Sequence, residues 1–440
     1  MSQAQVVAQL RSHIDELSDT IAAQIRLLRD LEVQRSAARR KLNSFLDPMA
    51  RLPLEIQSRI FLDVTKPNEP IPDPQDVPLL FLSICQLWRV IALATPRLWT
   101  GVELNCLPRR PAYAEVGKNW MERAGPFPLS LVLHGSLRLE RSVQDLVTSY
   151  RHRFESLSLK LGMDRNPNED GLTRRIYIKG PFPALQKLTL GADEEMFFST
   201  VHDWITILRQ APALVQCRME NMMFDWEDEG LPDTPQAHPL THTSLRDLSL
   251  GDAQGYGLWG LLGNSAFVLN FLTLPALRTL RLSELDITNE EINAFFTRSS
   301  APLESLSMVV PTDPEWAPQE AVEFFQPIQA RLRQLELVAP YRGDPNCAIA
   351  FVETLDGWLP ALQRLTIHMA CGSQPDYERL LNVLNARRTS MKVFNLLFST
   401  EFGHNYDADV PSSEVLTTLG NLVRNGMQIH VGPQGQNFIG

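Results

Sequence analysis

The feature that most constrains this chain is a six-residue pattern, apolar-x-x-apolar-x-apolar, that returns at intervals of 26 to 32 residues from residue 99 onward. The eleven copies, with their first residues, are WTGVEL (99), PLSLVL (128), FESLSL (154), LQKLTL (185), LVQCRM (214), LRDLSL (245), LRTLRL (277), LESLSM (303), LRQLEL (332), LQRLTI (362) and VFNLLF (393). Such regular spacing indicates an array of stacked units, each of which buries its apolar face against its neighbours.

Each copy predicts one short strand, and the intervals leave room for a helix. EEINAFFTR and YERLLNVLNA, for example, have the apolar spacing of amphipathic helices. The last copy is followed by SEVLTTLGNLVRNGMQIHVG, which predicts one more helix and a closing strand. Strand and helix repeated in parallel give an α/β fold. The pattern resembles the leucine-rich-repeat family with long units, which implies a horseshoe solenoid with the strands on its inner face.

The N-terminal segment predicts a long helix that ends before Pro48. Its seam positions alternate in steps of four and three: Leu10, Ile14, Leu17, Ile21, Gln24, Leu28, Leu31, Arg35, Ala38, Leu42 and Phe45. This heptad pattern is typical of a coiled coil, with two polar residues that would restrict the register. Two interpretations remain open: a homodimer through residues 10–45, or a helix that packs its apolar stripe against another part of the same chain.

A second helical segment follows, in two halves. The first half is MARLPLEIQSRIFLDV and the second is VPLLFLSICQLWRVIALATPRLWTGVEL, which supplies a further apolar helix. Residues 66–78 join them and contain five prolines. Short helices without an enclosed core of their own favour a partner.

This segment resembles the F-box family in Leu52-Pro53, Glu55-Ile56, Ile60-Phe61, Ile84-Cys85, Trp88-Arg89 and Leu98-Trp99. The resemblance covers roughly residues 50–104 and departs from the family in the long proline-rich loop. It implies binding to a Skp-type adaptor and, through it, to a cullin ubiquitin ligase. The residues implied in adaptor binding are Leu52, Pro53, Ile56, Ile60, Phe61, Cys85 and Trp88, the last two as braces between the helices. The alternative is a helical cap that closes the repeat array.

The predicted domains are therefore a heptad helix over 1–46, an F-box-like domain over 47–104 and degenerate leucine-rich repeats over 105–440. Within each repeat strand, the residue between the last two apolar positions should face away from the core. This row is polar and mixed, and arginine is enriched at protein interfaces. The expected target-binding residues on this face are Arg218, Arg281, Glu336, Arg364 and His368.

Composition narrows the class of partner. The formal net charge of -10 argues against nucleic-acid binding, which needs a basic face. The chain has neither a long uncharged apolar run nor a secretory signal pattern, and its five cysteines are widely spaced. We therefore expect an intracellular protein, in the cytoplasm or nucleus, with reduced thiols and no membrane contact.

The search for catalytic motifs supports no enzymatic role. Residues 255–260 match G-x-G-x-x-G, but the glycines begin five residues after the repeat strand, where a turn between repeats is the better interpretation. His238 and His242 lie among prolines without a nearby cysteine, so no zinc site is expected. The acidic, proline-rich stretch around them is expected to be a solvated loop. The sequence favours a non-enzymatic substrate-recognition adaptor of a ubiquitin ligase without metal or cofactor; the alternative is a repeat scaffold or inhibitor.

Overall fold

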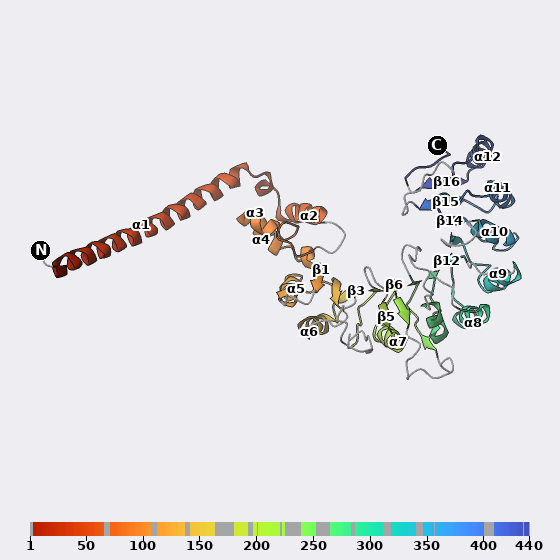
Figure 1. Ribbon diagram of the computed structural model, residues 1–440, viewed down its shortest axis with the longest axis horizontal. Coiled ribbons are helices and arrows are strands. Elements are labelled where there is room, and N and C mark those ends of the chain that lie inside the picture. The colour runs from red at the N-terminus through yellow and green to blue at the C-terminus, as the bar shows by residue number, and fades with distance from the viewer. Residues whose placement is uncertain are drawn as a thin grey trace. The chain divides into compact units, whose positions relative to one another are not determined.

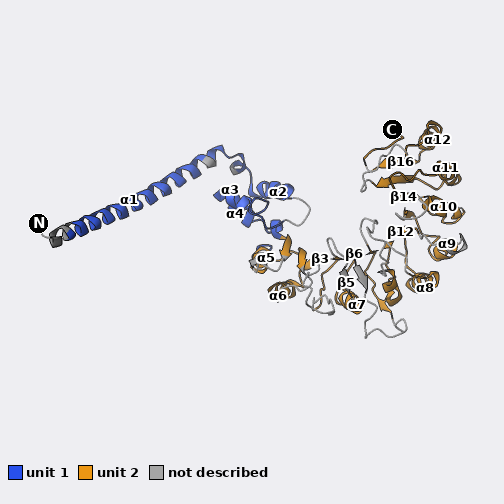
Figure 2. Cartoon of the chain, viewed as in Figure 1, with its two compact units in different colours: residues 1–99, 123–125 blue, residues 100–122, 126–440 orange. Residues whose placement is uncertain are grey.

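The chain separates into two compact units, which are described here one at a time (Figure 2). The first comprises Met1–Trp99 with Arg123–Gly125, and the second comprises Thr100–Glu122 with Pro126–Gly440. The computed structural model describes residues 3–65, 71–106, 112–136, 141–162, 180–191, 197–199, 201–220, 222–224, 239–251, 265–282, 287–310, 318–339, 346–355, 357–399, 409–433 and 435–439.

The first unit begins with the long helix α1, which spans Gln3–Leu46. It contains neither glycine nor proline, and it ends where Asp47 and Pro48 begin the short 3-10 helix η1, Pro48–Arg51. The Asp47 carboxylate accepts a hydrogen bond from the Met49 backbone N–H at 2.8 Å, which satisfies one of the free donors at the start of η1. The predicted long helix and its end before Pro48 are confirmed.

Short helices complete the first unit: α2 (Leu54–Val64), α3 (Phe81–Ile84), α4 (Gln86–Leu93) and the 3-10 helix η2 (Pro96–Trp99). The sequence predicted one apolar helix in the region of α3 and α4. Instead, Cys85 adopts an extended conformation with φ -158° and ψ 169° and divides the segment into two helices. The Trp99 indole donates to the Ala92 carbonyl at 3.0 Å, which ties η2 to α4.

The second unit contains a sheet of twelve parallel strands whose spatial order follows the chain order (Figure 1). The strands are β1 (Gly101–Cys106), β2 (Leu129–Ser136), β3 (Phe154–Gly162), β4 (Lys187–Gly191), β6 (Gln216–Glu220), β9 (Asp247–Leu250), β11 (Thr279–Leu282), β12 (Ser305–Val309), β13 (Gln334–Val338), β14 (Arg364–Ala370), β15 (Val393–Ser399) and β16 (Gln428–Pro433). The sheet is open, with β1 and β16 as its edges. Each pattern copy contributes one strand, as predicted, and the closing strand β16 is also present.

Two small parallel pairs accompany the main sheet: β5 (Phe197–Ser199) with β7 (Met222–Phe224), and β8 (Leu240–Thr241) with β10 (Leu272–Thr273). The helices of this unit are α5 (Ala112–Arg123), α6 (Arg141–Tyr150), α7 (Val201–Gln210), η3 (Ser265–Phe271), α8 (Asn289–Ser299), α9 (Pro318–Phe325), α10 (Cys347–Thr354), α11 (Tyr377–Ala386) and α12 (Ser413–Arg424). Helices α8 to α12 lie side by side along the strands (Figure 1). The fold is therefore α/β with a large parallel sheet.

The strand register places equivalent pattern positions beside one another. Leu306 pairs with Leu335, and Leu335 pairs with Leu365, all at the fourth position of their copies and at most 1% exposed. Helices cover this apolar face: a Cβ added to Gly117 of α5 would lie 2.8 Å from Cδ1 of Leu104 in β1. The apolar positions therefore form one continuous core between sheet and helices.

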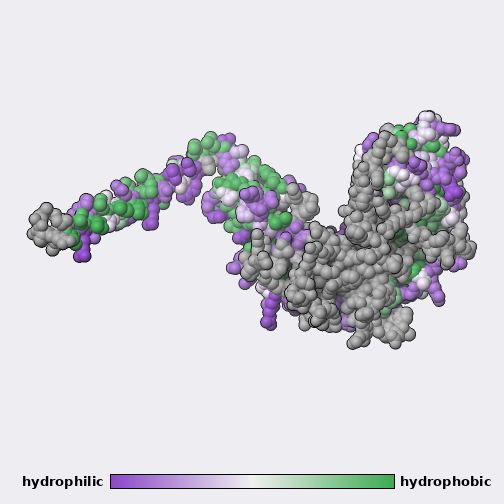
Figure 3. All heavy atoms as spheres, viewed as in Figure 1, coloured by the Kyte–Doolittle hydropathy of each residue, from purple (hydrophilic) through white to green (hydrophobic). Residues whose placement is uncertain are grey.

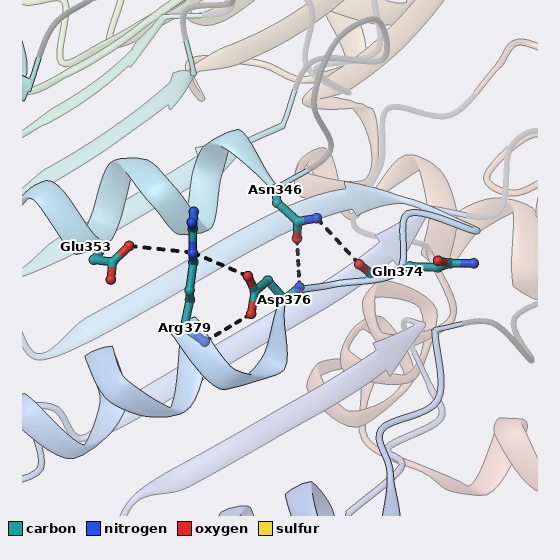
Figure 4. Close-up of polar contacts among 5 residues, drawn as sticks. All are labelled: Asn346, Glu353, Gln374, Asp376 and Arg379. Atoms are coloured by element: carbon teal, nitrogen blue, oxygen red, sulfur yellow. Dashed lines mark hydrogen bonds and ion pairs between the residues drawn. The ribbon is translucent and has the colours of Figure 1, made fainter.

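Polar contacts connect the neighbouring helices α10 and α11 (Figure 4). Asp376 caps α11 by accepting from the Arg379 backbone N–H at 3.1 Å, and its own N–H donates to the Asn346 side chain at 2.7 Å. The Arg379 guanidinium lies 3.3 Å from Asp376 and 3.9 Å from Glu353 of α10. These contacts join α10 and α11, which belong to neighbouring repeats.

The domain boundary at residue 104 stays a prediction, and one pattern copy needs correction. The first compact unit comprises Met1–Trp99 with Arg123–Gly125, and β1 pairs with β2 from Gly101. The copy VFNLLF was assigned from Val393, whereas Val393 pairs with Arg364, the third residue of the preceding copy. The last copy therefore begins at Met391, two residues earlier, and its two core positions on β15 are Phe394 and Leu396.

Candidate partner-binding surfaces

Helices α2, α3 and α4 of the first unit pack together through three aromatic side chains. The ring of Phe61 on α2 lies 4.2 Å from that of Phe81 on α3 and 5.1 Å from that of Trp88 on α4. The rings of Phe81 and Trp88 are 5.8 Å apart, in an edge-on arrangement. Rings at these separations attract one another beyond the burial of their apolar area. This cluster orients the outer faces of α2, α3 and α4.

The outer faces carry aliphatic side chains that are exposed. They are Leu52, Leu54, Ile56, Ile60, Val64, Leu80, Ile84, Val90 and Leu93, with exposures from 36% to 55%. We call this set the apolar helical surface. Figure 3 shows hydrophobic surface gathered over this part of the first unit. A soluble monomer rarely exposes so many aliphatic side chains on a few short helices, which indicates an interaction surface.

The predicted adaptor-binding residues divide into two groups. Leu52, Pro53, Ile56 and Ile60 are exposed, so their side chains are accessible to a partner. Phe61, in contrast, is 1% exposed at the centre of the aromatic cluster, so its side chain does not lie on the exposed face. Cys85 and Trp88 are half-buried, and Trp88 packs against Phe61 and Phe81, in keeping with a bracing role.

Sequence reasoning missed more than half of the apolar helical surface. The missed residues are Leu54, Val64, Leu80, Ile84, Val90 and Leu93. A usable signal existed on α2, where Val64 follows Ile60 by four positions, as Ile60 follows Ile56, so that the three side chains lie along one side of the helix. The exposure of the missed residues on α3 and α4 depends on the turn at Cys85, which no periodicity in the sequence predicted.

The second candidate surface is the face of the sheet opposite the apolar core. Its central row, the residue between the last two apolar positions of each copy, is Glu103, Val132, Ser158, Thr189, Arg218, Ser249, Arg281, Ser307, Glu336, Thr366, Asn395 and His430. We call this row, with its flanking residues, the polar sheet face. The sequence placed Leu397 in it, but Asn395 is the true partner of Thr366 and donates to its hydroxyl at 3.2 Å.

Two of the five predicted target-binding residues, Glu336 and His368, are in direct contact, and Arg281 and Arg364 lie on nearby strands of the same face. The Glu336 carboxylate lies 2.8 Å from His368 Nε2, on the next strand. The hydrogen bond with His368 is the main cause that lowers the pKa of Glu336, and Arg281 also contributes. Arg364 is exposed on β14, the strand that carries His368.

The remaining predicted residue, Arg218, is exposed on β6, farther along the sheet. Its guanidinium contacts the Gln216 side-chain oxygen at 2.8 and 2.9 Å when that amide is oriented to accept. Arg218 is therefore separated from Arg281 by β9, which places Ser249 between them in the row. The exposed arginines are spread over several repeats, as suits contact with an extended partner.

Sequence reasoning also missed a second histidine–carboxylate pair on this face. His134 Nε2 on β2 lies 3.2 Å from Glu103 Oε1 on β1. The signal was available, because Glu103 occupies the same pattern position in its copy as Glu336 does in its own. The two strands belong to the copies at residues 99 and 128, which the sequence had already identified.

The other sequence motifs form no site in the described part of the chain. The G-x-G-x-x-G match at 255–260 and His238 lie outside the described residues. His242 is buried, and its Nε2 lies 3.0 Å from the Ala211 carbonyl oxygen. Among the residues that the structure describes, no three His, Cys, Asp or Glu side chains gather as a metal site would require. Nor does any described helix have the length and apolar character needed to cross a membrane.

Comparison with known proteins adds no assignment. The chain matches no protein-family model and no curated protein. The two candidate surfaces therefore rest on the geometry described above.

Proposed function

We propose that this protein is the substrate receptor of a Skp-cullin-F-box type ubiquitin ligase. The apolar helical surface binds a Skp-type adaptor, and the polar sheet face binds a target protein. The repeat unit acts as a leucine-rich-repeat horseshoe in this proposal. The observation that carries it is the exposure of nine aliphatic side chains on helices whose orientation is fixed by an aromatic core.

The chemistry of the apolar helical surface suits an apolar protein partner. Ile56 is 48% exposed and Ile60 is 37% exposed, one helical turn apart on α2. Complete burial of a fully exposed aliphatic side chain of this size contributes about 1.5–3 kcal/mol, and these two side chains contribute the share that corresponds to their exposed part. A few such residues at the centre of an interface can dominate the free energy of binding.

The polar sheet face suits a polar protein target. It presents exposed arginines beside the Glu336–His368 pair, so both signs of charge are available within a few strands. Complementary charge steers association and selects among partners. We expect that reversal of charge at Arg281 and Arg364 weakens target binding and leaves adaptor binding unchanged.

The mechanism follows from proximity alone. A receptor that holds a target near a separate ubiquitin-carrying enzyme raises the effective concentration of the acceptor lysine. The receptor itself then needs no acid, base or nucleophile.

The test is co-purification of the full chain with a purified Skp-type adaptor. Ile56→Asp with Ile60→Asp should abolish binding, because both charges would be buried without partners. The matched control is Val410→Asp with Val423→Asp, since these valines are 46% and 39% exposed in the second unit. Loss of binding in the first variant alone supports the proposal. Absence of binding by the wild-type chain would favour a repeat scaffold or inhibitor instead.

A further inference from the structure

Helix α1 presents an apolar seam that is exposed in the single chain. The seam side chains Leu10, Ile14, Leu17, Ile21, Leu28, Leu31, Leu42 and Phe45 are 49% to 64% exposed. The helix has 44 residues and is therefore about 66 Å long at about 1.5 Å per residue. An isolated helix in water gains little stability from its own hydrogen bonds, so a long helix with an exposed seam favours a partner helix.

We propose that α1 pairs with α1 of a second copy as an antiparallel coiled coil, with Gln24 of each copy opposite Arg35 of the other. Two identical helices with a heptad seam can pair in this way, because a two-fold axis brings the seam of each helix against the same seam of the other. The inference is independent of ligase function.

The distribution of charge along α1 selects the antiparallel orientation. Residues 1–24 contain one basic side chain, Arg11, and three acidic ones, which gives a net charge of -2. Residues 25–46 contain six basic and two acidic side chains, which gives a net charge of +4. A parallel pair would place the two basic halves together, whereas an antiparallel pair places each acidic half beside a basic half. In the proposed register, Asp19 lies level with Arg40 of the other copy.

The polar seam residues select the register. In a parallel pair, Arg35 would meet Arg35 of the other copy in the same layer, and two guanidinium charges would share an apolar seam. In the proposed antiparallel pair, each Arg35 meets a Gln24, whose side-chain oxygen can accept from the guanidinium. Polar residues in such seams commonly fix register in this way. The same register sets Leu17 opposite Leu42 and Leu28 opposite Leu31.

The antiparallel orientation has a consequence for assembly. The chain continues from the C-terminal end of α1 directly into η1, where the Arg51 guanidinium donates to the Phe45 carbonyl at 2.8 Å. The two C-terminal ends of the pair lie at opposite ends of the rod. The dimer therefore presents two copies of α2–α4 at its opposite ends rather than side by side.

The first measurement is the mass of the full-length chain in solution. Light scattering should give twice the 49.7 kDa chain mass. Leu28→Asp with Leu31→Asp should return the mass to that of a monomer, while Val423→Asp on α12 should not. A monomeric wild-type chain at tens of micromolar would overturn the proposal.

The second measurement distinguishes orientation and register by disulfide cross-linking. Leu17→Cys and Leu42→Cys chains should form a cross-linked dimer only when they are mixed and allowed to exchange. The wild-type chain is the control for the native cysteines, and each single-cysteine chain should remain at that background by itself. Cross-linking of Leu17→Cys to itself would show a parallel pair. Preferential cross-linking of Leu10→Cys with Leu42→Cys would show another register, and either result would overturn the proposal.

Discussion

His368 Nε2 and Glu336 Oε1 lie 2.8 Å apart across β14 and β13. His134 and Glu103 repeat this diagonal relationship on β2 and β1, at 3.2 Å. In both pairs the glutamate occupies the central row, and the histidine lies two residues beyond the glutamate's register partner on the next strand. The polar sheet face thus carries ordered charges as well as solvated ones.

The first prediction concerns the pH dependence of stability at Glu336. The hydrogen bond from His368 holds the pKa of this carboxyl below its ordinary value of 4.5, and Arg281 adds to the effect. A lowered folded-state pKa contributes stability that is full above the ordinary value and is lost as pH falls through the lowered pKa.

Glu336→Gln should therefore destabilise the chain by about 1 kcal/mol at neutral pH and by progressively less as the carboxyl becomes protonated in acid. Urea unfolding at a series of pH values measures the difference. Glu304→Gln is the control, because its carboxylate pairs with Arg278 at an exposed position. A constant difference between wild type and Glu336→Gln down to the lowest pH would contradict the assignment.

The second prediction separates the aromatic core from the apolar helical surface. Phe61→Ala should destabilise the first unit by about 3–5 kcal/mol, because it removes the central ring of the cluster and leaves a cavity. Ile60→Ala, at a 37% exposed position on the same helix, should cost clearly less, about 1–1.5 kcal/mol, because the side chain is only partly buried. Limited proteolysis between residues 47 and 99 measures both. Equal resistance to the protease in the two variants would show that Phe61 is not at the centre of the aromatic cluster.

The third prediction compares two glycines of opposite environment. A Cβ on Gly191 in β4 would lie 2.5 Å from the Glu220 carbonyl oxygen on β6, so Gly191→Ala should destabilise the sheet by about 1–3 kcal/mol. A Cβ on Gly420 in α12 would meet nothing within 4 Å. Gly420→Ala should therefore stabilise by roughly 0.5–1 kcal/mol, because alanine favours a helix. Denaturant unfolding measures the change in the free energy of unfolding for both variants. A change of the same sign in the two variants would refute the assigned β4–β6 spacing.

The fourth prediction concerns the buried side chain of Asp409. Its carboxylate accepts from the backbone N–H groups of Gly372 at 2.6 Å and Gln374 at 3.1 Å, and its carbonyl accepts from the Tyr377 hydroxyl. Asp409→Ala removes the charged acceptor of both backbone N–H groups and should cost about 1–3 kcal/mol. Hydrogen exchange should show faster exchange at Gly372 and Gln374. The control Asp145→Asn, on the exposed side of α6, should leave hydrogen exchange at Gly372 and Gln374 unchanged. Equal exchange rates in the two variants would contradict the hydrogen bonds to the Asp409 carboxylate.

Much of the second unit was predictable from the sequence because one pattern repeats. In a parallel sheet with short connections, equivalent positions pair, so the copies fix both strand positions and the buried residues Leu306, Leu335 and Leu365. One copy, VFNLLF, was assigned in the wrong phase, and this error has a physical reason. Residues 393, 394, 396, 397 and 398 are all apolar, so two phases of the pattern fit, and only pairing with β14 selects Asn395 for the polar face.

The first unit was less predictable because its helices are too short to define a face. On α2, Ile60 and Phe61 are adjacent, and periodicity alone assigns either to the interior. The choice is made by Phe81 and Trp88, which lie beyond the proline-rich loop in sequence and pack on Phe61. The turn at Cys85 has no glycine or proline beside it that would have predicted it.

The central claim is that the apolar helical surface recruits a Skp-type adaptor, and calorimetric titration of the full chain with that adaptor tests it most directly. The predicted result is saturable binding with a negative heat-capacity change, as burial of apolar surface requires. Binding should disappear in Ile56→Asp with Ile60→Asp and persist in Val410→Asp with Val423→Asp. Absence of binding by the wild-type chain, or equal binding by both variants, would contradict the claim.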